Sequence, residues 1–192
     1  ADEWLEHSVI STSTKVDVLY PQFLASKRAT TSLSNCRPMD GRWRNKIQPL
    51  IGQKSIGRLT DGDLQQVLDR ALAGGYSRKS LQNLRADLCA FLKWARRNRY
   101  TTLTGEDLEI SKAAQRGQKR ILQPKDVLIL FNVDTTILRK NKAVEDYINA
   151  YRLEVLTGLR PGEINGLEWA DWHGDRLELR RAINCYGETT TG

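Results

Sequence analysis

The sequence is poor in the residues that hold metals and disulfides. It contains two histidines, His7 and His173, and three cysteines, Cys36, Cys89 and Cys185, which lie far apart and form no Cys-x-x-Cys pair. Zinc sites and disulfide frameworks draw on closely spaced cysteines and histidines, so this distribution argues against both. We expect no metal site, and the composition fits a reducing cytoplasm.

Long apolar runs are also lacking. No stretch approaches the roughly 20 apolar residues that a membrane-spanning helix needs. The N-terminus has no apolar segment of the kind found in signal peptides. We therefore expect neither a membrane span nor a secretory leader.

What the chain has in excess is positive charge. Thirty lysines and arginines stand against 23 acids, which gives a formal charge of +7 and a pI near 9.5. This balance suggests a polyanionic partner, although many basic proteins bind no nucleic acid. With 192 residues, 40% of them hydrophobic, the chain can form one large or two small domains with a packed core.

The stretch 157–169 predicts two helices joined by a tight turn. Gly158 suits the left-handed conformation that ends a helix, and Pro161 suits the first position of the next one. The turn does not explain Arg160, because a long cation is a poor helix cap. Two interpretations stay open: a surface arginine that pairs with Glu163, or a residue that holds an anion together with backbone N–H groups at the helix start.

Two regular helices are expected in the first half of the chain. Thr60 is a suitable N-cap for a helix over about 61–73, which Gly74 and Gly75 would end. Ser77 can begin a second helix that runs to about Asn98. The apolar stripe of this second helix comprises Leu81, Leu84, Leu88, Phe91, Leu92 and Ala95.

The start of the helix over 77–98 is rich in hydrogen-bond donors. Arg78 lies near its first turn, and Lys79, Gln82 and Asn83 lie opposite the apolar stripe. Cations and amides at a helix N-terminus suit contacts to phosphates and base edges. An ordinary exposed helix would look similar, so both interpretations stay open.

Two further segments are basic. Residues 29–48 include Arg42 and Lys46. We expect Trp43 and Ile47 to contact the core, and we expect the segment to end in a turn over 47–52. Residues 111–120 contain no acid and are typical of an interdomain linker. The cations of this linker are Lys112, Arg116, Lys119 and Arg120. Each segment is either a solvated surface or a contact to phosphates, in which case the linker would lie along a DNA backbone.

A second unit is expected after the linker. Pro124 opens a short apolar helix, and another helix is expected from Val144 to Leu156. Residues 176–183 resemble a strand, and 187–192 resemble a turn. A strand without a following partner indicates an incomplete sheet, so we expect the chain to be a fragment.

Residues 157–172 carry a more specific signal. They read Thr-Gly-Leu-Arg-Pro-Gly-Glu-Ile-Asn-Gly-Leu-Glu-Trp-Ala-Asp-Trp. This stretch resembles the first catalytic box of the tyrosine recombinases, the phage and transposon integrase family, with its Thr-Gly-hydrophobic-Arg, Glu-hydrophobic and Leu-x-Trp-x-Asp elements. Upstream, residues 47–64 and the helix that starts at Ser77 are similar to the core-binding domain of that family. The resemblance covers residues 14–192.

The resemblance implies a mainly α fold, in which a helical core-binding domain precedes the beginning of an α+β catalytic domain. The implied division is an N-terminal arm over residues 1–13, a DNA-binding domain over 14–110, a basic linker over 111–120 and an incomplete catalytic domain over 121–192.

The resemblance also implies a reaction. In this family a tyrosine attacks a DNA phosphate and forms a 3′-phosphotyrosyl link, without a metal or nucleotide cofactor. Arg160 matches the first catalytic arginine, whose planar guanidinium would stabilise transition-state charge, and Glu163 matches the acidic position that would orient it. The family's catalytic lysine, its His-x-x-Arg box and its tyrosine nucleophile have no match, so the chain alone is not expected to cleave DNA.

The implied partner is double-stranded DNA. The complete protein would be the integrase of a mobile element, would form a homotetramer on paired recombination sites, and would act in the cytoplasm at the nucleoid. One alternative is a non-enzymatic DNA-binding module that occupies or blocks such sites, and another is a helical domain with an unrelated partner. The residues expected to face DNA are Arg42, Lys46, Arg78, Lys79, Gln82, Asn83, Lys112, Arg116, Lys119 and Arg120.

Overall fold

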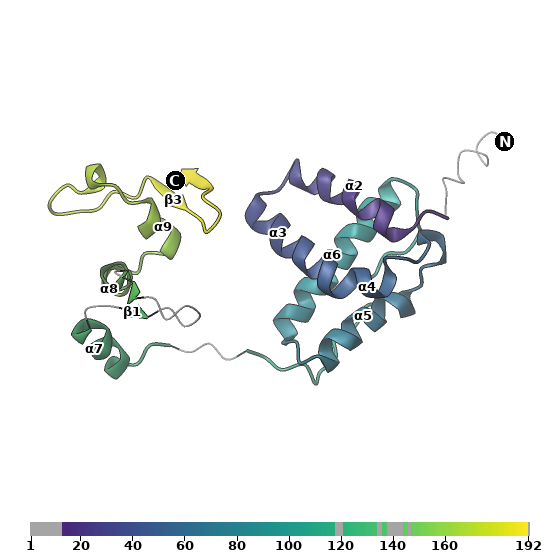
Figure 1. The fold of residues 1–192 in the computed structure, drawn as a ribbon, viewed down its shortest axis with the longest axis horizontal. Helices are drawn as coiled ribbons and strands as arrows, with labels where there is room; N and C mark the ends of the chain where they lie inside the picture. Colours follow the sequence, from purple (N-terminus) through teal and green to yellow (C-terminus); the bar gives the residue numbers. More distant parts are fainter. Residues whose placement is uncertain (1–12, 118–120, 134–135, 138–143, 146, 192) are drawn as a thin grey trace. The chain divides into compact units, whose positions relative to one another are not determined.

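The computed structural model describes residues 13–117, 121–133, 136–137, 144–145 and 147–191. Contacts divide the chain into two compact units, Ala1–Gln118 and Lys119–Gly192 (Figure 1). The expected arm over residues 1–13 lies outside the described residues, apart from residue 13. Within the described ranges, no helix combines the length and the apolar character needed to cross a membrane.

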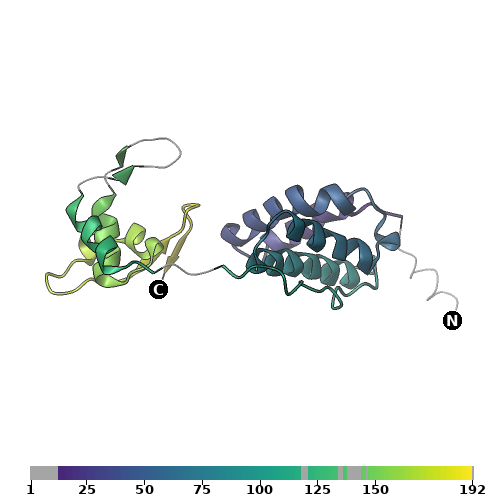
Figure 2. The ribbon, with the colours of Figure 1, turned by 90° about the horizontal axis from the view of Figure 1, so that it is seen from below.

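The first unit is helical. α2 (Val16–Arg28) and α3 (Leu33–Arg42) are followed by a π-helical turn, η1 (Trp43–Ile47), and by α4 (Gln48–Ile51). A 3₁₀ turn, η2 (Ile56–Arg58), leads to α5 (Asp61–Ala73) and α6 (Arg78–Arg97). α6 packs against both α2 and α5, as Figure 1 and Figure 2 show from two sides.

The starts of α5 and α6 confirm the caps expected from the sequence. Thr60 Oγ1 accepts the backbone N–H of Asp63 at 3.2 Å, and the Asp63 carboxylate accepts the N–H of Thr60 at 3.1 Å. This reciprocal pair is a capping box, which satisfies two N–H groups that the helix leaves without partners. Ser77 Oγ likewise accepts the N–H of Ser80 at 3.3 Å.

The apolar stripe of α6 lies at the centre of the core. All six predicted stripe residues are no more than 1% exposed. Phe91 meets Phe23 of α2 edge to face at 5.6 Å and lies 5.2 Å from Trp43 of η1, which in turn stacks on Tyr20 at 3.8 Å. Such aromatic pairs contribute about 1 kcal/mol each beyond their buried area, so the rings add to the apolar packing that holds α2, η1 and α6 together.

The C-terminal end of α6 has an unusual residue in its cap. The N–H of Tyr100 donates to the carbonyl of Ala95 at 2.9 Å, as in a Schellman motif. Arg99 takes the left-handed conformation that this motif requires, with φ of 59°. Glycine is the usual residue at this position, because it has no Cβ to clash there.

The basic segment over 29–48 is more helical than expected, and the turn predicted to begin at residue 47 is wrong. The helix continues through α4, and the turn follows it. Cys36, Met39, Trp43, Ile47 and Ile51 are all buried and recur at spacings of three and four residues. This helical periodicity was the signal that the polar composition of the segment obscured.

The second unit combines short helices with two hairpins. α7 (Pro124–Asn132) begins at the expected proline, and β1 (Thr136–Ile137) pairs antiparallel with β2 (Val144–Glu145). α8 (Ile148–Thr157), α9 (Pro161–Gly166) and a 3₁₀ turn, η3 (Trp169–Asp171), follow. β3 (Arg181–Ile183) and β4 (Thr189–Thr191) form the second antiparallel hairpin. The mainly α fold class is confirmed.

Two expectations for the second unit are wrong. The helix expected from Val144 begins only at Ile148, because Val144 and Glu145 pair with β1. The strand expected over 176–183 is regular only in β3, and it does have a partner, since β4 pairs with it. Asn184 makes the connecting turn possible, because its side-chain oxygen accepts the N–H groups of two following residues at 2.9 and 3.0 Å.

The capping box of α5 predicts a pH-dependent contribution to stability. Asp63 also accepts a hydrogen bond from Lys54, which is the main reason that the pKa of Asp63 is lowered. We expect Asp63→Ala to reduce the free energy of unfolding by about 1 kcal/mol at pH 7. Because the folded pKa is depressed, this contribution is complete above the unfolded value of about 3.9 and is lost as the pH falls through the lower folded value.

Urea unfolding followed by circular dichroism at pH 7 and at strongly acidic pH measures this loss. Asp61→Ala is the matched control, since Asp61 lies in the same helical turn and shares neither the Thr60 nor the Lys54 hydrogen bond with Asp63. An equal effect of Asp63→Ala at both pH values would contradict the prediction.

Candidate nucleic-acid interface and arginine pocket

The net positive charge of the chain lies entirely in one of its two units. Residues 1–118 contain 19 lysines and arginines against 12 acids, whereas residues 119–192 contain 11 of each. The first unit therefore carries the whole excess, and it is the part of the chain suited to attract a polyanion.

Three segments that are distant in the sequence meet at the start of α6. The Nζ atom of Lys46 lies over the ring of Tyr76, 4.7 Å from its centroid. The backbone N–H of Arg78 donates to the carbonyl of Gln115 at 2.8 Å, and the Arg78 guanidinium donates to the carbonyl of Ser111 at 3.4 Å. The residues predicted to bind DNA at Lys46, Arg78, Lys79, Lys112 and Arg116 are thus brought to one region of the surface.

The start of the expected linker is part of the first unit. Ala114 is only 4% exposed and belongs to the core cluster around α6, while Lys112 and Arg116 on either side of it are exposed. Packing of this small side chain fixes the basic segment against the helix. Lys119 and Arg120, also predicted to bind DNA, lie outside the described residues.

The outer face of α6 extends this region. Lys79, Gln82 and Asn83 share that face with Lys93 and Arg97, because residues at intervals of three, four and seven recur on one side of a helix. Asn83 is half-buried and the other four are exposed. A helix of 20 residues is about 30 Å long, so cations lie at both ends with amides near one of them. Sequence reasoning did not select Lys93 and Arg97, although their spacing from Lys79 was readable.

Arg42 has a different environment from the other predicted contacts. Its Nε and Nη2 atoms bind the two carboxylate oxygens of Asp87 in α6 at 2.5 and 3.0 Å. Burial raises the pKa of Asp87, and the hydrogen bonds from Arg42 oppose that rise. Hydrogen bonding to Asp87 also raises the pKa of Arg42. The structure places Arg42 as the partner of a buried acid on a core helix.

In the second unit, the backbone around Arg160 has the turn that Gly158 and Pro161 predicted. Gly158 ends α8 with φ of 70°, and Pro161 is the first residue of α9. Glu163 accepts the backbone N–H of Arg160 at 2.8 Å and pairs with its guanidinium at 3.3 Å. The Arg160 side chain is 86% exposed, and an ion pair at that exposure contributes at most about 1 kcal/mol. The pairing with Glu163 therefore leaves the guanidinium accessible to a ligand.

Arg160 borders a pocket between α9 and the β3–β4 hairpin. The pocket has a volume of about 360 Å³. It is lined by Arg160, Gly162, Glu163, Leu179, Arg181, Ala182 and Thr190. Arg181 also binds two acids, Asp171 at 3.0 Å and Glu168 at 2.7 Å, so its charge is already neutralised. Arg160 is the better placed of the two arginines to receive an anion.

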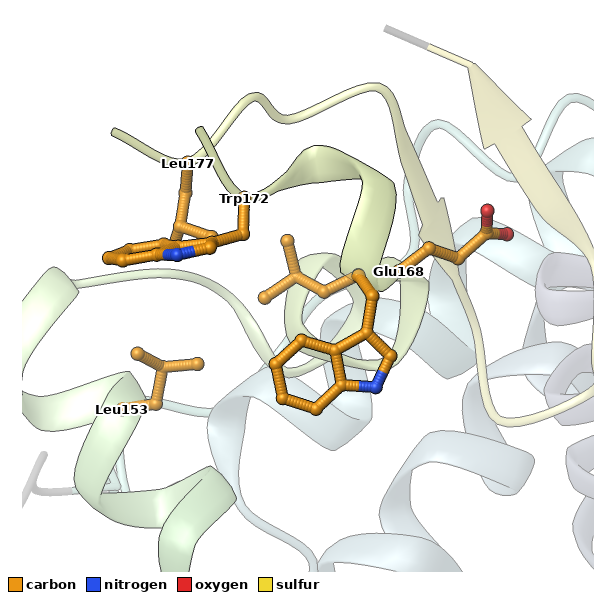
Figure 3. A pocket seen from close by; sticks show the side chains of 6 residues that line it. Leu153, Glu168, Trp172 and Leu177 are labelled. Atoms are coloured by element: carbon orange, nitrogen blue, oxygen red, sulfur yellow. The ribbon is translucent and has the colours of Figure 1, made fainter. Parts of the chain in front are cut away.

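A second hollow in this unit is apolar. It has a volume of about 610 Å³, and Leu153, Trp172 and Leu177 are among the side chains that line it (Figure 3). Glu168 stands at its edge, and Figure 3 shows the carboxylate turned away from the apolar side chains. The segment that carries Glu168 thus separates an apolar face from the charged groups beside β3.

Among the described residues, no group of three or more histidines, cysteines and acids is arranged to hold a metal.

The fold is shared with part of a transposon integrase. The Tn1549 transposon integrase in complex with a circular intermediate DNA matches 94% of this chain and 58% of that chain, with a TM-score of 0.73 and 18% identity. The same integrase in complex with transposon right end DNA matches 93% of this chain and 57% of that chain, with a TM-score of 0.69 and 16% identity. The predicted resemblance is confirmed at the level of the fold, and the chain spans somewhat more than half of the solved integrase chain, which itself comprises residues 82–397 of that integrase. No family model matches the sequence, and no curated protein matches it.

The Arg42–Asp87 pair predicts a large and specific stability effect. Arg42→Leu leaves a buried carboxylate without its partner, and we expect the free energy of unfolding to fall by about 3 kcal/mol. Arg42→Leu combined with Asp87→Leu removes both charges and should recover most of that loss. Urea unfolding measures both variants.

Arg44→Leu is the matched control, because Arg44 pairs with Asp40 while its side chain is 68% exposed. Its loss should stay below about 1 kcal/mol. If Arg42→Leu behaved like Arg44→Leu in unfolding and instead weakened DNA binding, Arg42 would belong to the interface rather than to the core.

Proposed function

We propose that this chain is the DNA-binding portion, together with the start of the catalytic domain, of a site-specific recombinase of a mobile element. In this proposal residues 14–110 form the core-binding domain, residues 111–120 connect the domains, and residues 121–192 begin the catalytic domain. The complete protein would cut and rejoin DNA through a 3′-phosphotyrosyl intermediate, as a homotetramer on paired sites at the nucleoid.

The observation that carries this proposal is the gathering of cations at the start of α6. Lys46, Arg78 and the segment with Lys112 and Arg116 meet there through the contacts to Tyr76, Ser111 and Gln115. Cations from three separate segments on one surface can neutralise several phosphates of one duplex at once. Lys119 and Arg120 would continue the same basic segment.

Duplex DNA suits this surface better than a small anion does. An α-helix fits the major groove, and its cations can bind the phosphates on either side. Gln82 and Asn83 lie on the same outer face, and an amide side chain can bind the edge of an adenine with two hydrogen bonds. Phosphate contacts would then provide affinity, and the amides would provide sequence preference.

The arginine pocket supports the recombinase part of the proposal. A phosphate under attack gathers negative charge on its non-bridging oxygens, and a guanidinium can donate two parallel hydrogen bonds to them. Arg160 is exposed beside a pocket of about 360 Å³, and Glu163 holds its backbone and restrains its side chain. The nucleophile and the remaining catalytic groups have no counterpart in these 192 residues. The reaction requires neither a metal nor a nucleotide.

Binding of this chain to duplex DNA tests the first part of the proposal. We expect Lys79→Ala combined with Gln82→Ala to weaken binding about tenfold or more, because one phosphate contact and one base contact are lost. Fluorescence anisotropy with a labelled duplex at fixed salt measures the affinity. Gln66→Ala combined with Arg70→Ala is the control, since it also removes one cation and one amide, at exposed positions of α5.

The salt dependence of the same titration distinguishes contact from general attraction. Removing the Lys79 contact should reduce the slope of log affinity against log salt by about one. The proposal fails if the unaltered chain does not bind duplex DNA, and the α6 face is excluded if both double variants bind equally.

A cleavage assay tests the second part. In a protein that contains this chain and forms covalent adducts with a suicide DNA substrate, Arg160→Lys should lower the rate of adduct formation by about 10² to 10³, because lysine cannot reproduce the bidentate contact. Site binding measured in parallel should change little. Near-normal cleavage would contradict the role of Arg160. If a longer protein that contains this chain bound its site tightly and formed no adduct even with an intact Arg160, the chain would instead fit a non-enzymatic module that occupies recombination sites.

A further inference from the structure

The position of Arg160 depends on contacts that it does not make itself. Its side chain is 86% exposed, and its backbone is set by the start of α9. α9 is only six residues long, so it cannot hold a fixed orientation through its own hydrogen bonds. Whatever α9 rests against therefore determines where the guanidinium can reach.

α9 rests against the backbone of β3. A Cβ on Gly166 would lie 2.5 Å from the carbonyl oxygen of Arg181 and 3.2 Å from the Cα of Ala182. A Cβ on Gly162, one turn earlier, would lie 3.2 Å from the carbonyl oxygen of Ile183. Two glycines on one side of α9 thus let helix and strand approach backbone to backbone, which fixes Arg160 relative to the β3–β4 hairpin.

β3 is in turn held by the pair Asp171 and Arg181. Asp171 is 1% exposed and accepts a hydrogen bond from the Arg181 guanidinium at 3.0 Å and from the backbone N–H of Glu168 at 2.8 Å. Its carbonyl accepts the N–H of Glu178 at 2.9 Å, just before β3. The Glu168 carboxylate also pairs with the Arg181 guanidinium at 2.7 Å. Figure 3 shows that this carboxylate points away from the apolar hollow. Desolvation of the two charges offsets much of their attraction, so a buried ion pair of this kind adds little net stability.

We infer that Asp171 and Arg181 are positioning residues for Arg160. They hold β3 at the distance from α9 that Gly162 and Gly166 permit, and so place the Arg160 guanidinium beside the pocket where a DNA phosphate would bind. The inference rests on the proposed function, since it assumes that Arg160 binds phosphate. Arg181 lines the same pocket but acts through its two acids and does not bind the phosphate.

Nuclear magnetic resonance of the 192-residue chain tests this inference. The Nε–Hε resonance of Arg160, assigned by its loss in Arg160→Lys, is followed during titration with duplex DNA. In the unaltered chain the resonance should shift. In Asp171→Asn and in Arg181→Leu that shift should be lost while the affinity for the duplex stays unchanged, because the first unit provides the affinity. Arg181→Lys keeps a cation opposite Asp171 and should restore part of the shift.

Glu178→Gln is the matched control, because Glu178 is an exposed acid that pairs with Arg180 and His173 instead of Arg181. It should leave the Arg160 shift intact. A full shift in both Asp171→Asn and Arg181→Leu would overturn the inference and leave the proposed function standing. Absence of a shift in the unaltered chain would overturn the role of Arg160 itself. If Asp171→Asn unfolds the second unit, as seen from the amide resonances of β3, Arg181→Lys decides: a shift reduced relative to the unaltered chain supports the inference, and an undiminished shift overturns it.

Discussion

The first unit depends on the burial of one face of α6. The aromatic rings of α2 and η1 pack on that face, α5 packs beside it, and Arg42 binds its one buried acid, Asp87. These contacts use the inner side of α6, and the outer side carries cations and amides that the core does not use. The same helix thus supplies the stability of the unit and the surface proposed to bind DNA.

Local chemistry made much of this fold predictable. Thr60 and Ser77 signalled the starts of α5 and α6, the stripe from Leu81 to Ala95 signalled the buried face, and Gly158 with Pro161 signalled the turn before α9. Each of these signals lies within a few residues of the feature that it determines. The box that contains Arg160 was recognisable for the same reason.

What could not be predicted lies in contacts between distant segments. Arg42 and Asp87 are 45 residues apart, and nothing near Arg42 distinguishes a partner of a buried acid from a ligand of phosphate. The packing of Ala114 against the α6 core, which holds the start of the expected linker against the first unit, likewise could not be read from the sequence. In the second unit, nothing in the sequence near Gly166 marks it as a packing residue, and only the structure shows its close approach to the Arg181 carbonyl.

At the C-terminal cap of α6, the residue that would be best for stability differs from the residue that would be best for positive charge. Arg99 adopts a left-handed backbone that costs a residue with a Cβ roughly 1 kcal/mol, a cost that glycine avoids. Selection for thermal stability alone would therefore replace this arginine, whereas selection for attraction to a polyanion would retain its charge beside Arg96 and Arg97. A library screened separately for heat resistance and for DNA retention should diverge at this one position, and the direction of divergence reports which demand shaped the end of the helix.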